Sequence, residues 1–378
     1  MRESAAERHK RLLELVRKRG SARVSDLAGL LGVSPVTVRR DVEALAGEGR
    51  LDRVHGSVSW PQGRGQGWEP WRGQAPGQGG AERRAGGGEL VLGLLAPSAT
   101  YYFAEVIRGA HEAAAQAGAR LVLRISDYRP EEDRSRAEGL LAAGAEGLLI
   151  APGWRGPKDP AEHGDWLTEL PVPTVLLERG AAPGSALDGL DRVVSDHRHG
   201  VLLAVRHLVG LGHGAPLLVA RADSPTALAV RSGYVDALDA LGLRAPREAI
   251  DSVSAEQRPE DFEAAVRALH TAVASGQATA AVVHNDVDAI QMVQRLAELG
   301  VRVPQDLALI AYDDEVAALA DTPLTAVAPP KRAVGRQAAR LLVERLTAGP
   351  DADEPRRHLS LLPRLRVRAS CGADQRTP

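Results

Sequence analysis

Between residues 90 and 312, seven short apolar runs alternate with longer segments typical of helices. The runs do not alternate apolar with polar residues, which indicates strands buried on both faces, as in parallel sheets. Parallel strands need a crossover connection, usually a helix. The pattern therefore predicts α/β architecture. The expected strands span 90–96, 120–125, 147–151, 174–177, 216–220, 280–284 and 307–312, and the expected helices span 103–117, 131–143, 200–210, 228–241, 259–274 and 286–299.

The 378-residue chain is too long for one ordinary domain, and the α/β region itself predicts two lobes. We expect the first lobe near residues 90–190 and the second near 195–320. A last helix at 331–347 is expected to return across the lobes, and residues 371–378 form a tail.

Ligands of parallel sheets bind beyond the carboxyl ends of the strands. The residues expected there combine aromatic rings with carboxylate, amide and guanidinium groups. A sugar fits this set, because its C–H face packs on a ring while its hydroxyls bind forked acceptors and donors. A nucleobase fits much of this set too. For Tyr102 and Phe103, ordinary packing in the core is the alternative. The candidates are Tyr102, Phe103, Trp154, Arg179, Asn285, Asp286 and Asp313, with Tyr101 and Glu178 beside them.

Residues 90–370 resemble the ligand-sensing domain of LacI-family repressors, which is related to periplasmic sugar-binding proteins. The resemblance rests on motifs at 92–121, 147–152, 212–220, 230–238, 284–286 and 300–314, the last ending in Tyr-Asp-Asp. It implies a two-lobed periplasmic-binding-protein-like fold in which Arg231 and Asp313 bind ligand hydroxyls. A structural ion pair is the alternative for Arg231. The resemblance also implies that Asn285 or Asp286 assists, that Tyr102 and Phe103 line the first lobe, and that helix 106–116 helps to form a dimer.

Residues 34–45, SPVTVRRDVEAL, predict a helix with one apolar face and one polar face. Ser34 is a good N-cap, and Pro35 fits the first helical position. At 100° per residue, Val38, Val42 and Leu45 share one face, whereas Arg40 points the other way. Upstream, Leu12, Leu13 and Val16 form an apolar stripe on a first helix, and Ser25 is expected to cap a second helix that carries Leu27, Leu30 and Leu31.

Residues 49–60 predict a β-hairpin around His55-Gly56, beside the helix. The order of elements over residues 8–58 resembles the N-terminal winged helix-turn-helix domain of DeoR-family repressors, except that Ser57 replaces the usual second glycine. Residues 1–60 carry twelve Lys and Arg against eight Asp and Glu, a net charge of +4, whereas the whole chain is −2. A basic module suits phosphate binding; a scaffold for a protein partner is the alternative. The expected DNA contacts are Ser34, Val36, Thr37, Arg39, Arg40, Arg53 and His55.

Residues 61–89 are expected to be a flexible linker between the domain at 1–60 and the sensor at 90–370. Ten of these 29 residues are glycine, and Ile, Leu, Val and Phe are absent, so the stretch cannot bury an apolar core. LacI-family proteins instead carry a hinge helix at this point, whose pattern does not occur here. The ligand is therefore expected to act by changing how a sensor dimer spaces two winged modules.

Composition narrows the classes of protein further. One cysteine, Cys371, argues against a disulfide framework or a thiolate zinc cluster. The start of the chain has no signal-peptide pattern and no apolar run is long enough to cross a membrane, so a cytoplasmic protein is expected. Neither a cofactor nor a metal is expected. Metal binding by Asp196, His197, His199, His207 and His213 is an alternative that we disfavour, because Asp196 is expected to cap a helix and His213 lies in a Gly-His-Gly turn that ends one.

We expect a ligand-responsive transcriptional regulator, a repressor and homodimer that binds operator DNA and a sugar or related metabolite, and not an enzyme. A carbohydrate-active enzyme with a regulatory N-terminal module is the alternative. It lacks support because the sequence shows no Ser/His/Asp constellation, phosphate loop or zinc motif at a convincing spacing. A plain sugar-binding protein is a third possibility, which the DNA-binding pattern disfavours.

Overall fold

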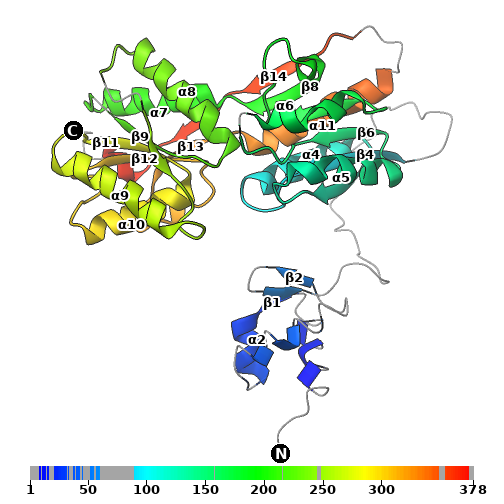
Figure 1. Ribbon diagram of the computed structural model, residues 1–378, viewed down its shortest axis with the longest axis horizontal. Coiled ribbons are helices and arrows are strands. Elements are labelled where there is room, and N and C mark those ends of the chain that lie inside the picture. Colours follow the sequence, from blue (N-terminus) through cyan, green and yellow to red (C-terminus); the bar gives the residue numbers. More distant parts are fainter. Residues whose placement is uncertain are drawn as a thin grey trace, which may run out of the picture. The chain divides into compact units, whose positions relative to one another are not determined.

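The computed structural model describes most of the chain and divides it into two compact units, Met1–Arg83 and Arg84–Pro378 (Figure 1). For residues 21–26, 52–54 and 57–59 only the backbone is described. The described residues are 8–9, 11–13, 15–16, 21–31, 33, 37–38, 40–42, 45, 52–54, 57–59, 89–156, 158–214, 216–244, 248–348 and 354–373.

The first unit contains helical segments and a small antiparallel sheet. Helix α2 spans Val24–Leu31, and strands β1 (Ser21–Arg23), β2 (Asp52–Val54) and β3 (Ser57–Ser59) pair in the order β1-β3-β2. The β2–β3 pair confirms the expected hairpin, but strand β1 was not expected. Helix α2 starts one residue before Ser25, so the expectation that Ser25 precedes and caps this helix is wrong.

Apolar side chains of three helical segments form the core of the first unit. Val38, Val42 and Leu45 are buried together, which confirms the apolar face expected for residues 34–45. Leu30 is 42% exposed, so the stripe on α2 is narrower than expected. The other buried members of this core are Leu12, Leu13, Val16, Leu27, Ala28 and Leu31.

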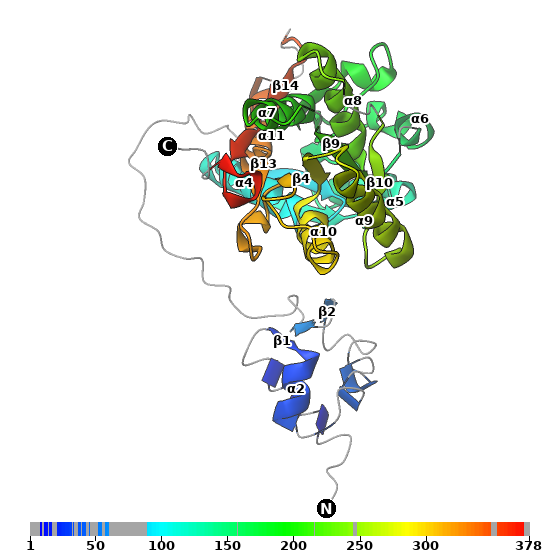
Figure 2. The same ribbon diagram turned by 90° about the vertical axis from the view of Figure 1, so that its left-hand side faces the viewer.

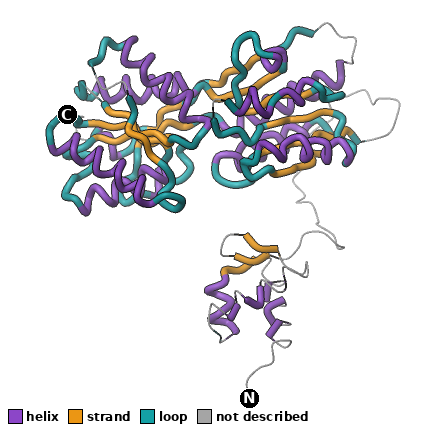
Figure 3. Tube along the Cα trace, in the orientation of Figure 1, coloured by secondary structure: helices purple, strands orange, loops and turns teal. Residues whose placement is uncertain are grey.

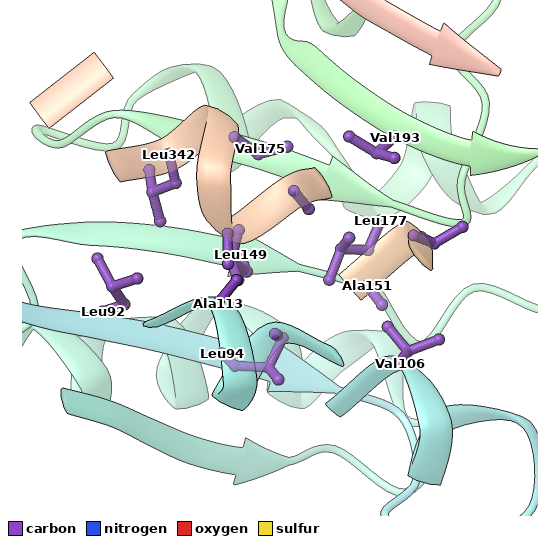
Figure 4. Close-up of a cluster of buried hydrophobic side chains, with 14 of the residues drawn as sticks. Leu92, Leu94, Val106, Ala113, Leu149, Ala151, Val175, Leu177, Val193 and Leu342 are labelled. Carbon is purple, nitrogen blue, oxygen red and sulfur yellow. The ribbon is translucent and has the colours of Figure 1, made fainter. Parts of the chain in front are cut away.

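The first lobe of the second unit is a parallel six-stranded sheet, in the order β14-β8-β7-β6-β4-β5, with helices on both faces (Figure 3). Buried side chains of α4 and α11 cover one face, and the cluster between them is shown in Figure 4. The strands are β4 (Leu90–Ala96), β5 (Ala119–Ile125), β6 (Gly147–Ile150), β7 (Thr174–Leu177), β8 (Asp191–Ser195) and β14 (His358–Leu361), and the helices are α4 (Tyr102–Gln116), α5 (Pro130–Ala142), α6 (Asp159–His163) and α11 (Lys331–Ala348).

The second lobe contains a six-stranded sheet in the order β10-β9-β11-β12-β13-β15, parallel except for the last pair. Helices α7 and α8 cover one face, and α9 and α10 cover the other (Figure 2). The strands are β9 (Leu217–Arg221), β10 (Ile250–Ser252), β11 (Ala280–His284), β12 (Ala308–Tyr312), β13 (Thr325–Ala328) and β15 (Arg364–Arg366), and the helices are α7 (His197–Gly210), α8 (Pro225–Ala240), α9 (Pro259–Ala274) and α10 (Asp286–Glu298).

The chain passes between the two lobes three times. It leaves the first sheet after β8, returns from β13 to α11, and crosses again between β14 and β15. The final helix α11 therefore returns to the first lobe, as expected, where it packs against α4 and the sheet. The carboxyl ends of the parallel strands place residues of both lobes at one cleft.

Two glycines allow helices α4 and α11 to pack backbone against backbone. A Cβ atom built on Gly335 would lie 1.9 Å from the carbonyl oxygen of Val106, and one on Gly109 would lie 2.0 Å from that of Arg332. Real Cβ contacts are never so short, so any larger residue at either position must push the two helices apart.

We expect Gly335→Ala to lower the free energy of unfolding by about 1–3 kcal/mol, the usual cost of overpacking. Chemical denaturation followed by circular dichroism measures the change. Gly210→Ala, at the end of α7 where the added Cβ meets nothing within 4 Å, is the matched control and should leave stability unchanged or raised. Equal effects of the two substitutions would contradict the close packing of α4 on α11.

Candidate functional site: the pocket between two lobes

A pocket of about 260 Å³ lies between the two lobes of the second unit. Its residues come mainly from loops and helix starts that follow strand carboxyl ends, as expected for parallel sheets. The first lobe contributes Tyr101, Tyr102, Phe103, Tyr128, Arg155, Glu178 and Arg179, and the second contributes Arg221, Asp223, Ser224, Pro225, Thr226, Gln257, His284, Asn285 and Asp313.

A buried hydrogen-bond network fixes Tyr102 in the wall of the first lobe. Its hydroxyl donates to Glu178 Oε1 at 2.7 Å and lies 3.1 Å from Ser195 Oγ. Glu178 also accepts from the Ser195 backbone N–H at 2.9 Å and from its hydroxyl at 2.8 Å. The aromatic ring of Tyr102 packs edge-on against Phe103, with 5.6 Å between centroids. Both aromatic side chains therefore have fixed positions at the pocket.

Asp313 is held at the end of β12 by its backbone and faces Tyr101 across the cleft. Its backbone N–H donates to Val327 at 3.0 Å, and its φ of 89° is in the left-handed region. The side chain is 4% exposed. The Tyr101 hydroxyl donates to Asp313 Oδ2 at 3.4 Å and also to Asp286 Oδ1, so it joins the first lobe to the second.

Burial shifts the protonation of two pocket residues. It raises the pKa of Asp313 to about 7, against the opposing effect of the nearby Lys331 ammonium. It lowers the pKa of His284 to about 3, so this imidazole is neutral at physiological pH. Among the described residues, Asp313 Oδ1 and both His284 ring nitrogens have no hydrogen-bond partner. Such unpaired buried groups are costly unless a ligand satisfies them.

A second polar cluster lines the wall of the second lobe. Arg221, the last residue of β9, forms a two-bonded ion pair with Asp223 at 2.8 and 2.9 Å. The same guanidinium lies 3.8 Å from Asp288, whose pKa burial raises to about 6. Asn285 lines the pocket while its side-chain oxygen caps α10 by accepting from the Asp288 N–H at 3.1 Å. Ligand groups at this wall would meet a preorganised surface.

Five of the eight predicted ligand residues line this pocket, and three lie elsewhere. Trp154 is buried in the first lobe and borders an adjoining hollow of about 930 Å³, which shares Glu178, Arg179, Pro225 and Thr226 with this pocket. Arg231 donates to the Ala220 carbonyl and to Asp251, both at 2.7 Å, which is the structural alternative considered for it. Asp286 is fully buried and accepts from the backbone N–H groups of residues 315–317. The five pocket residues are Tyr102, Phe103, Arg179, Asn285 and Asp313.

Sequence reasoning missed several residues of the pocket. Tyr128 follows β5, and Arg221 and Asp223 end and follow β9, so the rule of strand carboxyl ends covers them too. His284 was assigned to a strand, and it is the last residue of β11. Gln257 precedes α9, and no signal in the sequence distinguishes it.

In the first unit, Asp41 joins two helical segments. Its carboxylate accepts from Arg8 Nε at 2.5 Å and Nη2 at 3.0 Å, and it lies 3.0 Å from His9 Nε2. These bonds lower the pKa of Asp41, with the Arg8 bond as the largest cause. Its neighbour Arg40 is exposed, on the side opposite the core. Asp41 is therefore bonded inside the unit, whereas the adjacent Arg40 lies at the surface.

The other predicted DNA contacts are described only in part. Thr37 is helical and half-buried, and the backbone of Arg53 lies in β2. Ser34, Val36, Arg39 and His55 lie outside the described residues, as do residues 61–88 of the expected linker.

Within the described ranges, no group of three or more His, Cys, Asp or Glu side chains is arranged to hold a metal ion. No helix in that part of the chain is long and apolar enough to cross a membrane.

Two protein-family models match the chain. A DeoR-like helix-turn-helix domain matches residues 8–62, and a periplasmic binding protein-like domain matches residues 205–371. The chain therefore joins these two kinds of domain.

Curated relatives and solved structures agree with these matches. The chain is 27% identical over 288 residues to the HTH-type transcriptional repressor PurR of Vibrio atlanticus, covering 74% of this chain and 80% of the relative. A putative LacI-family regulator from Sanguibacter keddieii is 27% identical with a TM-score of 0.59, covering 75% and 100%. The lac repressor dimer bound to operator and an anti-inducer has a TM-score of 0.60 at 24% identity, covering 76% and 95%, a likeness of fold alone.

The raised pKa of Asp313 predicts a pH-dependent stability. The unfolded carboxyl has a pKa near 3.9, so the folded state binds the proton more tightly, and the contribution of Asp313 to stability falls by about 1.4 kcal/mol per pH unit between roughly pH 4 and 7. The variant Asp313→Asn has no carboxyl at this position, so its free energy of unfolding does not include this fall. Its free energy of unfolding should therefore rise relative to the unsubstituted protein from pH 5 to 7 and level off above pH 7, as measured by urea denaturation.

The control is Asp306→Asn. Asp306 is half-buried and its pKa is about 2 because of its hydrogen bonds with Arg302, so it is ionised in both states above pH 5. It should show no trend between pH 5 and 8. The same flat result for Asp313→Asn would mean that Asp313 is ionised throughout this range.

Proposed function

We propose that this chain is a transcriptional repressor whose affinity for operator DNA changes when a small polar metabolite, a sugar or related compound, binds between the lobes of its sensor. The observation that carries the proposal is the inter-lobe pocket, where some buried polar atoms lack a hydrogen-bond partner among the described residues. A helix-turn-helix domain on the same chain supplies the output.

The exposed Arg40 supports DNA recognition by the first unit. Arginine is the usual side chain for reading guanine in the major groove and also pairs with phosphates. Asp41 anchors the same segment to Arg8 and His9, so the helix that carries Arg40 has a fixed place in the unit. The predicted helix geometry adds four DNA contacts beside Arg40, namely Ser34, Val36, Thr37 and Arg39. The flanking DNA backbone is contacted by Arg53 and His55.

Contacts across the cleft supply a route by which a ligand affects the lobes. The Tyr101 hydroxyl of the first lobe bonds to two carboxylates of the second, and Lys331 at the start of α11 bonds to the Asp313 carbonyl and to Glu315. A ligand that binds Asp313 changes the contacts that Tyr101 and Lys331 make with this residue, and it thereby favours one arrangement of the two lobes. In a homodimer, that change would alter the spacing of two DNA-binding units on a palindromic operator.

We expect Arg40→Ala to weaken specific operator binding by about 1–3 kcal/mol, roughly tenfold or more in Kd, because a base or phosphate contact is lost. Fluorescence anisotropy with the DNA upstream of the coding gene measures this. Arg366→Ala, which removes an exposed arginine from β15 of the sensor, is the matched control and should leave Kd unchanged. An unaltered Kd for Arg40→Ala would remove this residue from the DNA interface.

Effector affinity should rise with pH up to about 7, because the Asp313 carboxylate must be ionised to accept hydroxyl groups. Below its pKa the expected loss approaches tenfold per pH unit. Titration calorimetry at pH 6, 7 and 8 with whichever compound of a sugar and nucleoside panel shifts operator binding tests this. Asp313→Asn should abolish the response and keep operator affinity, and a pH-independent affinity would argue that Asp313 binds its ligand in the neutral form.

A further inference from the structure

The first-lobe wall of the pocket contains a buried cation that forms no ion pair with a carboxylate of the described residues. Arg179 is 6% exposed, and its guanidinium donates from Nε to the Pro152 carbonyl at 3.0 Å and from Nη1 to the Glu178 carbonyl at 2.9 Å. Both acceptors are neutral. Within the described part of the chain, Nη2 has no hydrogen-bond partner and no carboxylate forms an ion pair with this side chain.

Two partly buried arginines of the described residues have carboxylate partners. Arg345 donates from Nε and Nη2 to the two oxygens of the buried Asp191, both at 2.8 Å. Arg368 bonds to Asp314 at 2.7 Å. A buried charge is costly without such a partner, and arginine prefers the two oxygens of a carboxylate or phosphate. Among the described residues, Arg179 therefore lacks the paired anion that Arg345 and Arg368 have.

The remaining groups near Arg179 do not replace that anion. The Phe103 ring lies 5.8 Å from the guanidinium carbon, a contact that favours the cation only weakly. Arg155, on the same side of the pocket, stacks over Tyr128 at 5.1 Å and adds a second positive charge. Burial lowers the pKa of Arg179, and the nearby charges of Glu178 and Asp133 oppose this shift, although neither carboxylate forms an ion pair or a hydrogen bond with the guanidinium among the described residues.

The second-lobe wall offers the opposite chemistry. Asp313 is buried, its Oδ1 has no partner among the described residues, and Asn285 lies on the same wall. A ligand that satisfies both walls needs an acidic group for Arg179 and a hydroxyl or other donor for Asp313. A neutral sugar meets only the second requirement.

We propose that the effector is an anionic polyol, a small polyhydroxylated acid whose acid group pairs with Arg179 and whose hydroxyl groups donate to Asp313. The inference rests on the proposed function, because it takes the inter-lobe pocket as the effector site. Carboxylate and phosphate share the required chemistry.

Matched pairs of compounds test this with the purified full-length protein in titration calorimetry. D-gluconate against D-glucitol and D-glucuronate against D-glucose differ in the acid group, and D-glucose 6-phosphate separates phosphate from carboxylate. The acid member of at least one pair should bind ten times tighter or more than its neutral partner. Equal binding within all pairs, tighter binding of the neutral members, or no binding by any acid would overturn the inference.

Arg179→Gln should lower affinity for the preferred acid at least tenfold and change that for its neutral partner less than twofold. Arg179→Lys, which keeps the charge, should retain part of the preference. Arg134→Gln, an exposed site on α5, is the control, and melting curves establish that each variant is folded. An equal loss for both members of a pair would assign Arg179 a structural role.

The two proposals fail differently. If a neutral compound binds, shifts operator affinity and loses its effect in Asp313→Asn, the pocket remains an effector site and only the acid requirement is wrong. If no sugar, acid or nucleoside binds or changes operator affinity, the sensor function itself is contradicted.

Discussion

The carboxylate of Asp286 holds together the part of the fold on which the pocket depends. It is fully buried, and it accepts hydrogen bonds from three successive backbone N–H groups, those of Glu315, Val316 and Ala317, and from the Tyr101 hydroxyl. These bonds tie the start of α10 to the loop after β12. Because Asp313 stands at the beginning of that loop in a left-handed conformation, its place at the cleft depends on an acidic residue that does not line the pocket.

Much of this architecture could be predicted, because the relevant signals are local. Strands buried on both faces leave continuous apolar runs, and β4, β7 and β11 match the expected bounds. Short or half-exposed strands carry weaker signals: β8 alternates buried and half-buried residues, and β15 has only three residues. Both depend on neighbours distant in sequence, so the sequence pattern did not reveal them.

Site residues were predictable as far as strand ends determine them. Tyr102, Arg179 and Asp313 follow strands and meet at the pocket, although they belong to distant segments. The partner of a long side chain depends on the tertiary structure, which strand ends do not determine. Arg231 is therefore bonded to Asp251 and Trp154 is packed in the core, although both were expected to bind the ligand. The same limit applies to Asp41, whose pairing with Arg8 across 33 residues no helical period encodes.

The three passages of the chain between the lobes also determine how the sensor can be divided. The first lobe is assembled from residues 89–195 together with 331–361, and the second from residues 197–328 together with 364–373. Neither lobe is a continuous stretch of polypeptide. A ribosome therefore cannot complete the first sheet until it has made β14, and premature termination before β14 would deprive both sheets of an edge strand at once.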